Sequence, residues 1–203
     1  GQCVTPTPPP PGVTGSATFD MKLSFQGIIK APLSGQTSMD VLVTLASDDL
    51  EEDFATTSTF TVDESGVWSG QASFDNVPAG GGYKLLVKGP EHVQKKVCEL
   101  IPTETAPGTY HCGDGDITVD VENTNTSDFS SIKMLVGDLT AQDGVVDSYD
   151  ISLVRNSLCT SANPELCKDP GVVTVADLNL DGLVDTQDYS LLISSLSIKT
   201  DEF

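Results

Sequence analysis

Two segments near the C-terminal end of the sequence repeat one another. Residues 138–158 read DLTAQDGVVDSYDISLVRNSL, and residues 177–196 read DLNLDGLVDTQDYSLLISSL. The copies align along their whole length once one extra residue is allowed in the first. This duplication predicts two similar small units that pack against each other, because neither copy is long enough to bury a core alone.

The second copy has the spacing of a calcium-binding loop. Oxygen-bearing side chains stand at positions one, three, five, nine and twelve, which are Asp177, Asn179, Asp181, Asp185 and Asp188. Gly182 at position six permits a sharp turn, and Leu183 at position seven would offer its carbonyl oxygen. Since Ca²⁺ takes six to eight oxygen ligands, this spacing predicts a calcium site. A solvated acidic turn would explain neither the spacing nor the glycine.

The first copy has one residue more, so its glycine falls one position late. An unshifted register would place Leu139 and Ala141 at ligand positions, where their side chains offer no oxygen. We therefore predict a second calcium site with a one-residue bulge between Thr140 and Asp143. Its expected ligands are Asp138, Thr140, Asp143, Asp147, Asp150 and the carbonyl oxygen of Val145, with Gln142 as a further oxygen donor. Two calcium ions are thus expected, and an empty or weak first loop is the alternative.

A helix is expected after each loop, with one apolar face. The residues on these faces are Leu153, Val154 and Leu158 in the first copy and Leu191, Leu192 and Leu196 in the second. Because the two faces supply each other's core, metal binding and folding of residues 132–203 should be coupled.

The preceding residues 15–122 predict an all-β domain. Apolar and polar residues alternate from Ala17 to Phe25, which is typical of a half-buried strand. About seven short strands separated by turns suggest a two-sheet sandwich, Ig-like or transthyretin-like. Residues 123–131 are predicted to be a polar linker. The prolines in residues 1–14 predict a polyproline spacer, which suggests a further domain or an anchor upstream.

Four of the five cysteines bracket two polar loops. Cys98 and Cys112 flank one, and Cys159 and Cys167 flank the other. Local pairing of each couple predicts two disulfides and an oxidising, extracellular or cell-surface setting. Four free thiols in a cytosolic protein are the alternative, and the role of Cys3 stays open.

The charge balance excludes several functions. Asp and Glu number 30 against 10 Lys and Arg, which gives a formal net charge of −20. This charge opposes binding to nucleic acid or to an anionic membrane and favours a cation such as calcium. Because the sequence contains no GxSxG, no zinc-ligand cluster and no phosphate-binding loop, we expect a non-catalytic protein.

The duplicated loop–helix resembles the type I dockerin module over residues 137–198. Asp stands at position twelve of both loops, and a strand-like run from Ile132 to Val136 replaces the entering helix of an ordinary EF-hand. The resemblance implies calcium-dependent binding to a cohesin domain, usually at a cell surface. The partner-binding residues it implies are Ser148, Tyr149 and Arg155 in the first copy and Thr186, Gln187 and Ile193 in the second. Because the two sets differ chemically, a single binding mode is expected.

A second resemblance concerns the β domain. The segment FDNVPAGGGYKLLVK at residues 74–88 resembles the transthyretin-like and carboxypeptidase-regulatory-like sandwiches, which implies an accessory domain. A sandwich followed by a dockerin-like module is similar to X-module–dockerin pairs. Two alternatives stay open: a structural surface protein whose calcium module packs on its own sandwich, or a carbohydrate-binding module in which Trp68 and Tyr83 stack on a sugar. Exposure of the implied partner-binding residues would favour the cohesin-binding function over the structural one.

Overall fold

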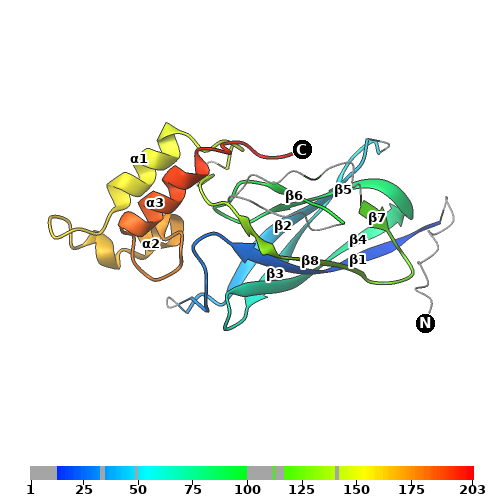
Figure 1. The fold of residues 1–203 in the computed structure, drawn as a ribbon, viewed down its shortest axis with the longest axis horizontal. Helices are drawn as coiled ribbons and strands as arrows, with labels where there is room; N and C mark the ends of the chain where they lie inside the picture. Colours follow the sequence, from blue (N-terminus) through cyan, green and yellow to red (C-terminus); the bar gives the residue numbers. More distant parts are fainter. Residues whose placement is uncertain (1–12, 33–34, 49, 100–111, 113–116, 140–141) are drawn as a thin grey trace.

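The computed structural model describes residues 13–203, apart from 33–34, 49, 100–111, 113–116 and 140–141. The chain forms a β domain and a smaller helical part at one end of it (Figure 1). This confirms the predicted class of a mostly β chain with a small helical C-terminal unit. Nearly all of the predicted spacer, with Cys3, lies outside the described residues, and Thr14 already opens the first strand.

The described part of the β domain contains eight strands. They are β1 (Thr14–Phe25), β2 (Ser38–Ala46), β3 (Phe54–Val62), β4 (Val67–Pro78), β5 (Gly80–Lys88), β6 (Lys95–Val97), β7 (Ile117–Val119) and β8 (Asn125–Met134). Their hydrogen-bonded order is β6–β5–β2–β3–β4–β1–β8, and β7 pairs with β5. Alternation in the sequence becomes alternation of burial: Ala17, Phe19, Met21 and Leu23 of β1 all point into the core.

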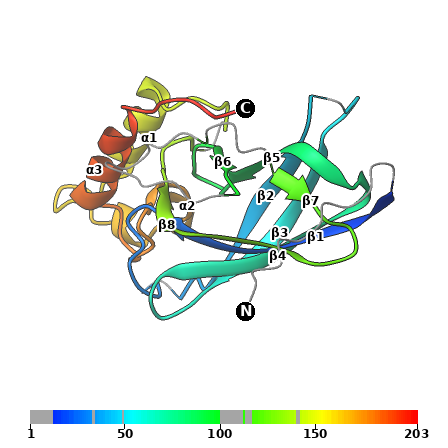
Figure 2. The same ribbon diagram turned by 45° about the vertical axis from the view of Figure 1, so that its right-hand side comes forward.

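The predicted two-sheet sandwich is not confirmed, because hydrogen-bonded neighbours follow one continuous path. β3 and β4 pair only near their shared turn, at Thr61–Ser69 and Val62–Trp68. In Figure 2, β5 and β6 lie above β1 and β4. Gly70 permits the close approach of β4 to β3, since a Cβ there would lie 2.6 Å from the ring of Phe60. The sheet therefore curves around a shared core instead of dividing into two layers.

The predicted polar linker at 123–131 is wrong, because most of it belongs to β8. This strand pairs in parallel with β1, from Phe19–Asn125 to Phe25–Met134. Phe129, Ile132 and Met134 are buried in the core of the β domain. The polar residues that suggested a linker occupy the outward positions of an edge strand. Strand β8 thus leads directly from the β domain into the first loop.

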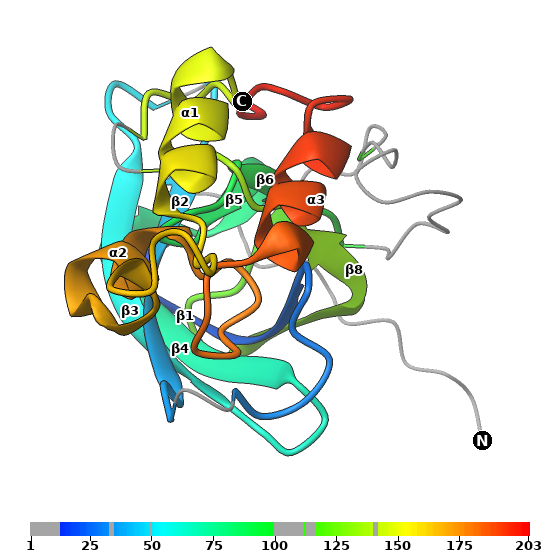
Figure 3. The ribbon, with the colours of Figure 1, turned by 90° about the vertical axis from the view of Figure 1, so that its left-hand side faces the viewer.

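The helical part contains the two predicted helices and a further one. They are α1 (Ser148–Ser157) and α3 (Thr186–Ser195), with α2 (Pro170–Ala176) and a 3₁₀ turn (Leu166–Lys168) between them. Figure 3 shows α1 and α3 side by side at the end of the molecule. The predicted apolar faces pack on a second core, in which Val154 and Leu192 are fully buried. Two disulfides are present, Cys98–Cys112 in the β domain and Cys159–Cys167 between α1 and α2.

The two parts are joined by backbone and side-chain contacts. Val93 of the β domain belongs to the core of the helical part, and its N–H donates to the carbonyl oxygen of Leu135 at 2.9 Å. The buried side chain of Gln26 donates from Nε2 to Ser194 Oγ at 2.7 Å and accepts at Oε1 from the N–H of Val136 at 3.2 Å. The helical part therefore packs on the β domain through α3 and the end of β8.

His92 lies at this junction and is only 2% exposed. Its ring packs on Phe25 with 4.5 Å between the ring centroids, and neither ring nitrogen has a hydrogen-bond partner among the described residues. Burial lowers the pKa of His92 to about 3. The imidazole is therefore neutral in the folded protein at neutral pH.

We expect His92 to make the protein less stable in mild acid. Because its folded pKa is about 3 and the unfolded value is about 6.5, the unfolded chain binds more protons between these values, and stability falls as pH falls through that window. Wild type should lose about 2 kcal/mol more than His92→Leu between pH 7 and pH 5. Urea unfolding of both proteins at both pH values measures this difference. An identical pH dependence of the two proteins would contradict it.

Candidate metal centre

The second predicted loop, between α2 and α3, is closed by its first and last aspartates. Both are buried, Asp177 at 5% and Asp188 at 0% exposed. Asp188 accepts at Oδ1 from the N–H of Leu178 and at Oδ2 from the N–H of Asp185, each at 2.8 Å. Asp177 accepts at Oδ2 from the N–H of Gly182 at 2.8 Å. The backbone thus wraps around these two carboxylates.

The other residues of the second loop form its turn and the start of α3. Gly182 has φ +93°, a conformation that favours glycine, as its place at the sharp turn requires. Asp185 caps α3: its Oδ1 accepts from the N–H of Gln187 at 2.6 Å, and Asp188 completes the capping box. Asn179 Oδ1 and Asp181 Oδ1 accept from backbone N–H groups inside the loop, those of Asp181 and Leu183.

The loop concentrates negative charge where water is partly excluded. Burial, together with the charges of Asp188 and Asp181, raises the pKa of Asp177 to about 6, although hydrogen bonds from backbone N–H groups oppose the shift. Burial also raises the pKa of Asp188, while its backbone hydrogen bonds oppose that shift. A cation placed among these oxygens would offset both the burial of the carboxylates and the repulsion between them. An all-oxygen donor set suits a hard cation such as Ca²⁺.

The first loop repeats the same hydrogen bonds in spite of its extra residue. The four bonds are Gly144 N–H to Asp138 Oδ2 at 3.1 Å, Val145 N–H to Asp143 Oδ1 at 3.1 Å, Leu139 N–H to Asp150 Oδ1 at 3.1 Å and Asp147 N–H to Asp150 Oδ2 at 2.9 Å. Each has its counterpart in the second loop. The register from Asp143 onward is therefore the one that the predicted bulge requires.

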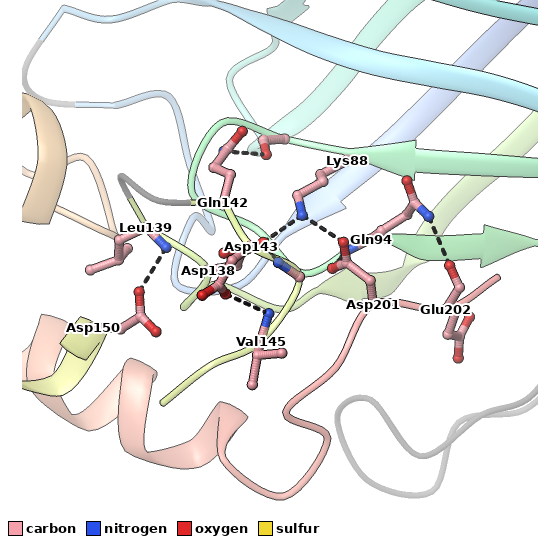
Figure 4. A network of polar contacts seen from close by, with 12 residues as sticks. Lys88, Gln94, Asp138, Leu139, Gln142, Asp143, Val145, Asp150, Asp201 and Glu202 are labelled. Carbon is pink, nitrogen blue, oxygen red and sulfur yellow. Dashed lines mark hydrogen bonds and ion pairs between the residues drawn. The ribbon is translucent and has the colours of Figure 1, made fainter. Parts of the chain in front are cut away.

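The extra residue is accommodated before Asp143. Thr140 and Ala141 lie outside the described residues, and the next residue, Gln142, has φ +42°. The Gln142 amide points toward the β domain, with Nε2 3.5 Å from the carbonyl oxygen of Gly89 (Figure 4). Val145 pairs with Thr200 of the C-terminal tail in an isolated β-bridge.

A lysine from the β domain distinguishes the first loop from the second. The ammonium of Lys88, at the end of β5, contacts Asp138 Oδ2 and lies 2.6 Å from Asp201 Oδ2 (Figure 4). Burial alone would lower the pKa of Lys88, but its bonds to Asp138 and Asp201 outweigh this and hold that pKa above its ordinary value. Burial raises the pKa of Asp138, and Lys88 partly offsets the shift. The second carboxylate oxygen, Asp138 Oδ1, is buried without a partner among the described residues.

The predicted ligands of both loops are all oxygen atoms. Among the described residues, no three His, Cys, Asp or Glu side chains converge as metal ligands. The predicted sets also use an asparagine, two backbone carbonyls and Thr140. The unpartnered Asp138 Oδ1 and the oxygen-only donors fit a hard cation. The calcium ligands named from the spacing therefore stay a prediction, and Thr140 among them lies outside the described residues.

The six implied partner-binding residues are all on the surface. Tyr149 is 61% and Ile193 40% exposed, and Ser148, Arg155, Thr186 and Gln187 are exposed as well. Among the described contacts, the implied partner-binding residues of the second copy lie beside the β1–β2 loop, and those of the first copy do not. Gln187 lines a hollow together with the β1–β2 loop at residues 27–32, and Leu191 of α3 lies against Gly27.

Comparison with protein families gives a match in the C-terminal part of the chain. Residues 136–197 match the family model of the dockerin type I domain. No curated protein and no solved structure matches the chain. The match supports a dockerin module here; such modules bind calcium and cohesin domains in general and occur in extracellular or cell-surface proteins. No helix in the described part of the chain is long and apolar enough to cross a membrane.

We expect Asp181→Asn to weaken calcium binding at the second loop by about tenfold or more, because the number of ligand charges sets the affinity of such loops. The asparagine oxygen can still accept from Leu183, so the fold should persist. Asp169→Asn is the matched control, since Asp169 caps α2 outside the loop and the charge change is the same. Calorimetric titration of both variants measures the effect, and equal affinities in the two variants would contradict the assignment.

Proposed function

We propose that this chain is a non-catalytic, calcium-dependent protein-interaction module that binds a cohesin-type domain in an extracellular or cell-surface assembly. One observation carries the proposal: two duplicated acidic loops share one hydrogen-bond framework and each starts a helix with an exposed outer face. The helices α1 and α3 pack on each other, so the loops set the position of both faces.

The α1 face is the better candidate for partner binding. Tyr149, at 61% exposure, is a large side chain held at the surface by a capped helix start, the kind of residue that anchors protein interfaces. On α3, a partner that reached Gln187 would meet the β1–β2 loop beside it, where Ile29 is 76% exposed. This asymmetry supports a single binding mode that uses Ser148, Tyr149 and Arg155.

The contacts between the two parts agree with one element of the structural alternative, the packing of the helical part on the β domain. Gln26 binds Ser194, and Lys88 binds Asp138 and Asp201. These contacts occupy the side of α3 and the first loop, and they leave the outer face of α1 free. The two functions are therefore compatible: the β domain holds the module while α1 binds the partner, as in an X-module–dockerin pair.

The carbohydrate-binding alternative needs exposed rings at Trp68 and Tyr83, and both side chains are buried. Trp68 is 0% exposed and packs edge-on against Phe25, with 5.8 Å between ring centroids. Tyr83 is 4% exposed, and its hydroxyl donates to the carbonyl oxygen of Pro78 at 2.7 Å. Neither ring can stack on a sugar, because both are core residues.

Paired alanine variants test the proposed face. In the presence of calcium, the Ser148→Ala/Tyr149→Ala double variant should lose about 30-fold or more in affinity for a type I cohesin domain, as expected for an interface anchor. Thr186→Ala/Gln187→Ala should lose less than about 3-fold. Calorimetry against a panel of type I cohesin domains, with a chelator as control, measures both. Equal losses would contradict a single binding mode, and no binding to any cohesin domain would favour the structural alternative.

A further inference from the structure

The first loop holds a positive charge that the second lacks. Lys88 is 9% exposed, and its partners Asp138 and Asp201 are 1% and 9% exposed. At the equivalent position of the second loop, Asp177 accepts from the backbone N–H groups of Asp181 and Gly182, and no lysine or arginine pairs with it in the described part of the chain. The duplication is therefore symmetric in its backbone and asymmetric in its charge.

The ammonium is part of the loop and not only of the domain junction. Asp201, which shares Lys88, donates its N–H to the carbonyl oxygen of Gly144 at 2.9 Å and accepts at Oδ1 from the N–H of Gln94 at 2.7 Å. Gly144 is the turn glycine of the first loop. Strand β5, the loop turn and the C-terminal tail thus meet at one buried amine (Figure 4).

The Lys88 ammonium contacts the carboxylate of Asp138, which stands at position one of the first loop. Lys88 contacts Oδ2 of Asp138, which also accepts from Gly144, and leaves Oδ1 buried and unpartnered. A calcium ion that used Oδ1 would share the carboxylate's single charge with Lys88 and would lie near a like charge in a partly dry site. Both effects weaken calcium binding at this loop.

We propose that Lys88 is a resident cation of the first loop, which holds that loop folded on the β domain without calcium and makes it the weaker calcium site. The inference rests on the proposed calcium binding but not on the cohesin partner. It predicts that calcium acts first at the second loop, while the first loop and the start of α1 are already formed.

The test is calcium titration of Lys88→Met, which removes the charge and keeps a long apolar side chain. Each variant is placed in the Asp181→Asn background, which weakens the second loop, and the titration is fitted with two sites so that a change at the first loop can be read. We expect Lys88→Met to bind calcium at the first loop at least about tenfold more tightly than the same background with Lys88. In chelator its melting temperature should fall, because Asp138 and Asp201 lose a buried partner.

Two further variants keep the test decisive. Lys95→Met is the matched control: Lys95 pairs with Glu202 of the same tail at 2.6 Å, so it removes a neighbouring charge that does not touch Asp138. Lys88→Arg keeps the charge and should keep the weak site, even if Lys88→Met folds only with calcium. Unchanged or weaker binding in Lys88→Met, or equal tightening in Lys95→Met, would overturn the inference. Absence of calcium binding in wild type as well as in every variant would instead overturn the proposed function.

Discussion

The C-terminal part depends on one arrangement that occurs twice, a buried aspartate that binds the backbone at both ends of its loop. Asp150 and Asp188 each accept from an N–H at the loop start and from the N–H of the helix-capping residue. The same carboxylate therefore closes the loop, starts the helix and stands at position twelve of the predicted calcium site. Because a buried carboxylate is costly without hydrogen bonds or a cation, these backbone bonds offset part of the free-energy cost of burying it.

The two helices follow from these loops. Asp147 and Asp185 cap α1 and α3, so each helix begins at a defined residue and points its apolar side toward the other. Val154 and Leu192 then meet in a core to which the β domain contributes Val93. The outer faces that remain, above all around Tyr149, are set by the same caps. Loop closure, helix packing and the proposed binding face are consequences of one local pattern.

The β domain gives the two equivalent units different surroundings. Gln26 and Gly27 lie against α3, and the ammonium of Lys88 contacts Asp138 of the first loop. The duplication therefore yields one helix with a free face and one that is partly flanked, and one loop that contains an ammonium and one that does not. This difference supports the proposals of a single partner face and of unequal calcium sites.

Much of the C-terminal part could be predicted from spacing alone, because calcium loops and helix caps are local and place their donors at fixed intervals. The two loops, the register of the first copy from Asp143 onward, the helices α1 and α3 and their apolar faces all belong to this class. The strands of the β domain were also predictable from their alternation of polar and apolar residues, as in β1. Strand β8 was not, since its polar outward residues resemble a linker until it pairs with β1.

The sequence by itself determined two repeated acidic loop–helix units, an alternating all-β segment and two local cysteine pairs. Each depends on residues that are close along the chain. Only the tertiary structure decided that the sheet is continuous, that α3 rests on Gln26, and that Lys88 meets Asp138 and Asp201. The two contacts of Lys88 join residues 50 and 113 positions apart, and the local sequence around an aspartate does not determine which distant lysine will pair with it.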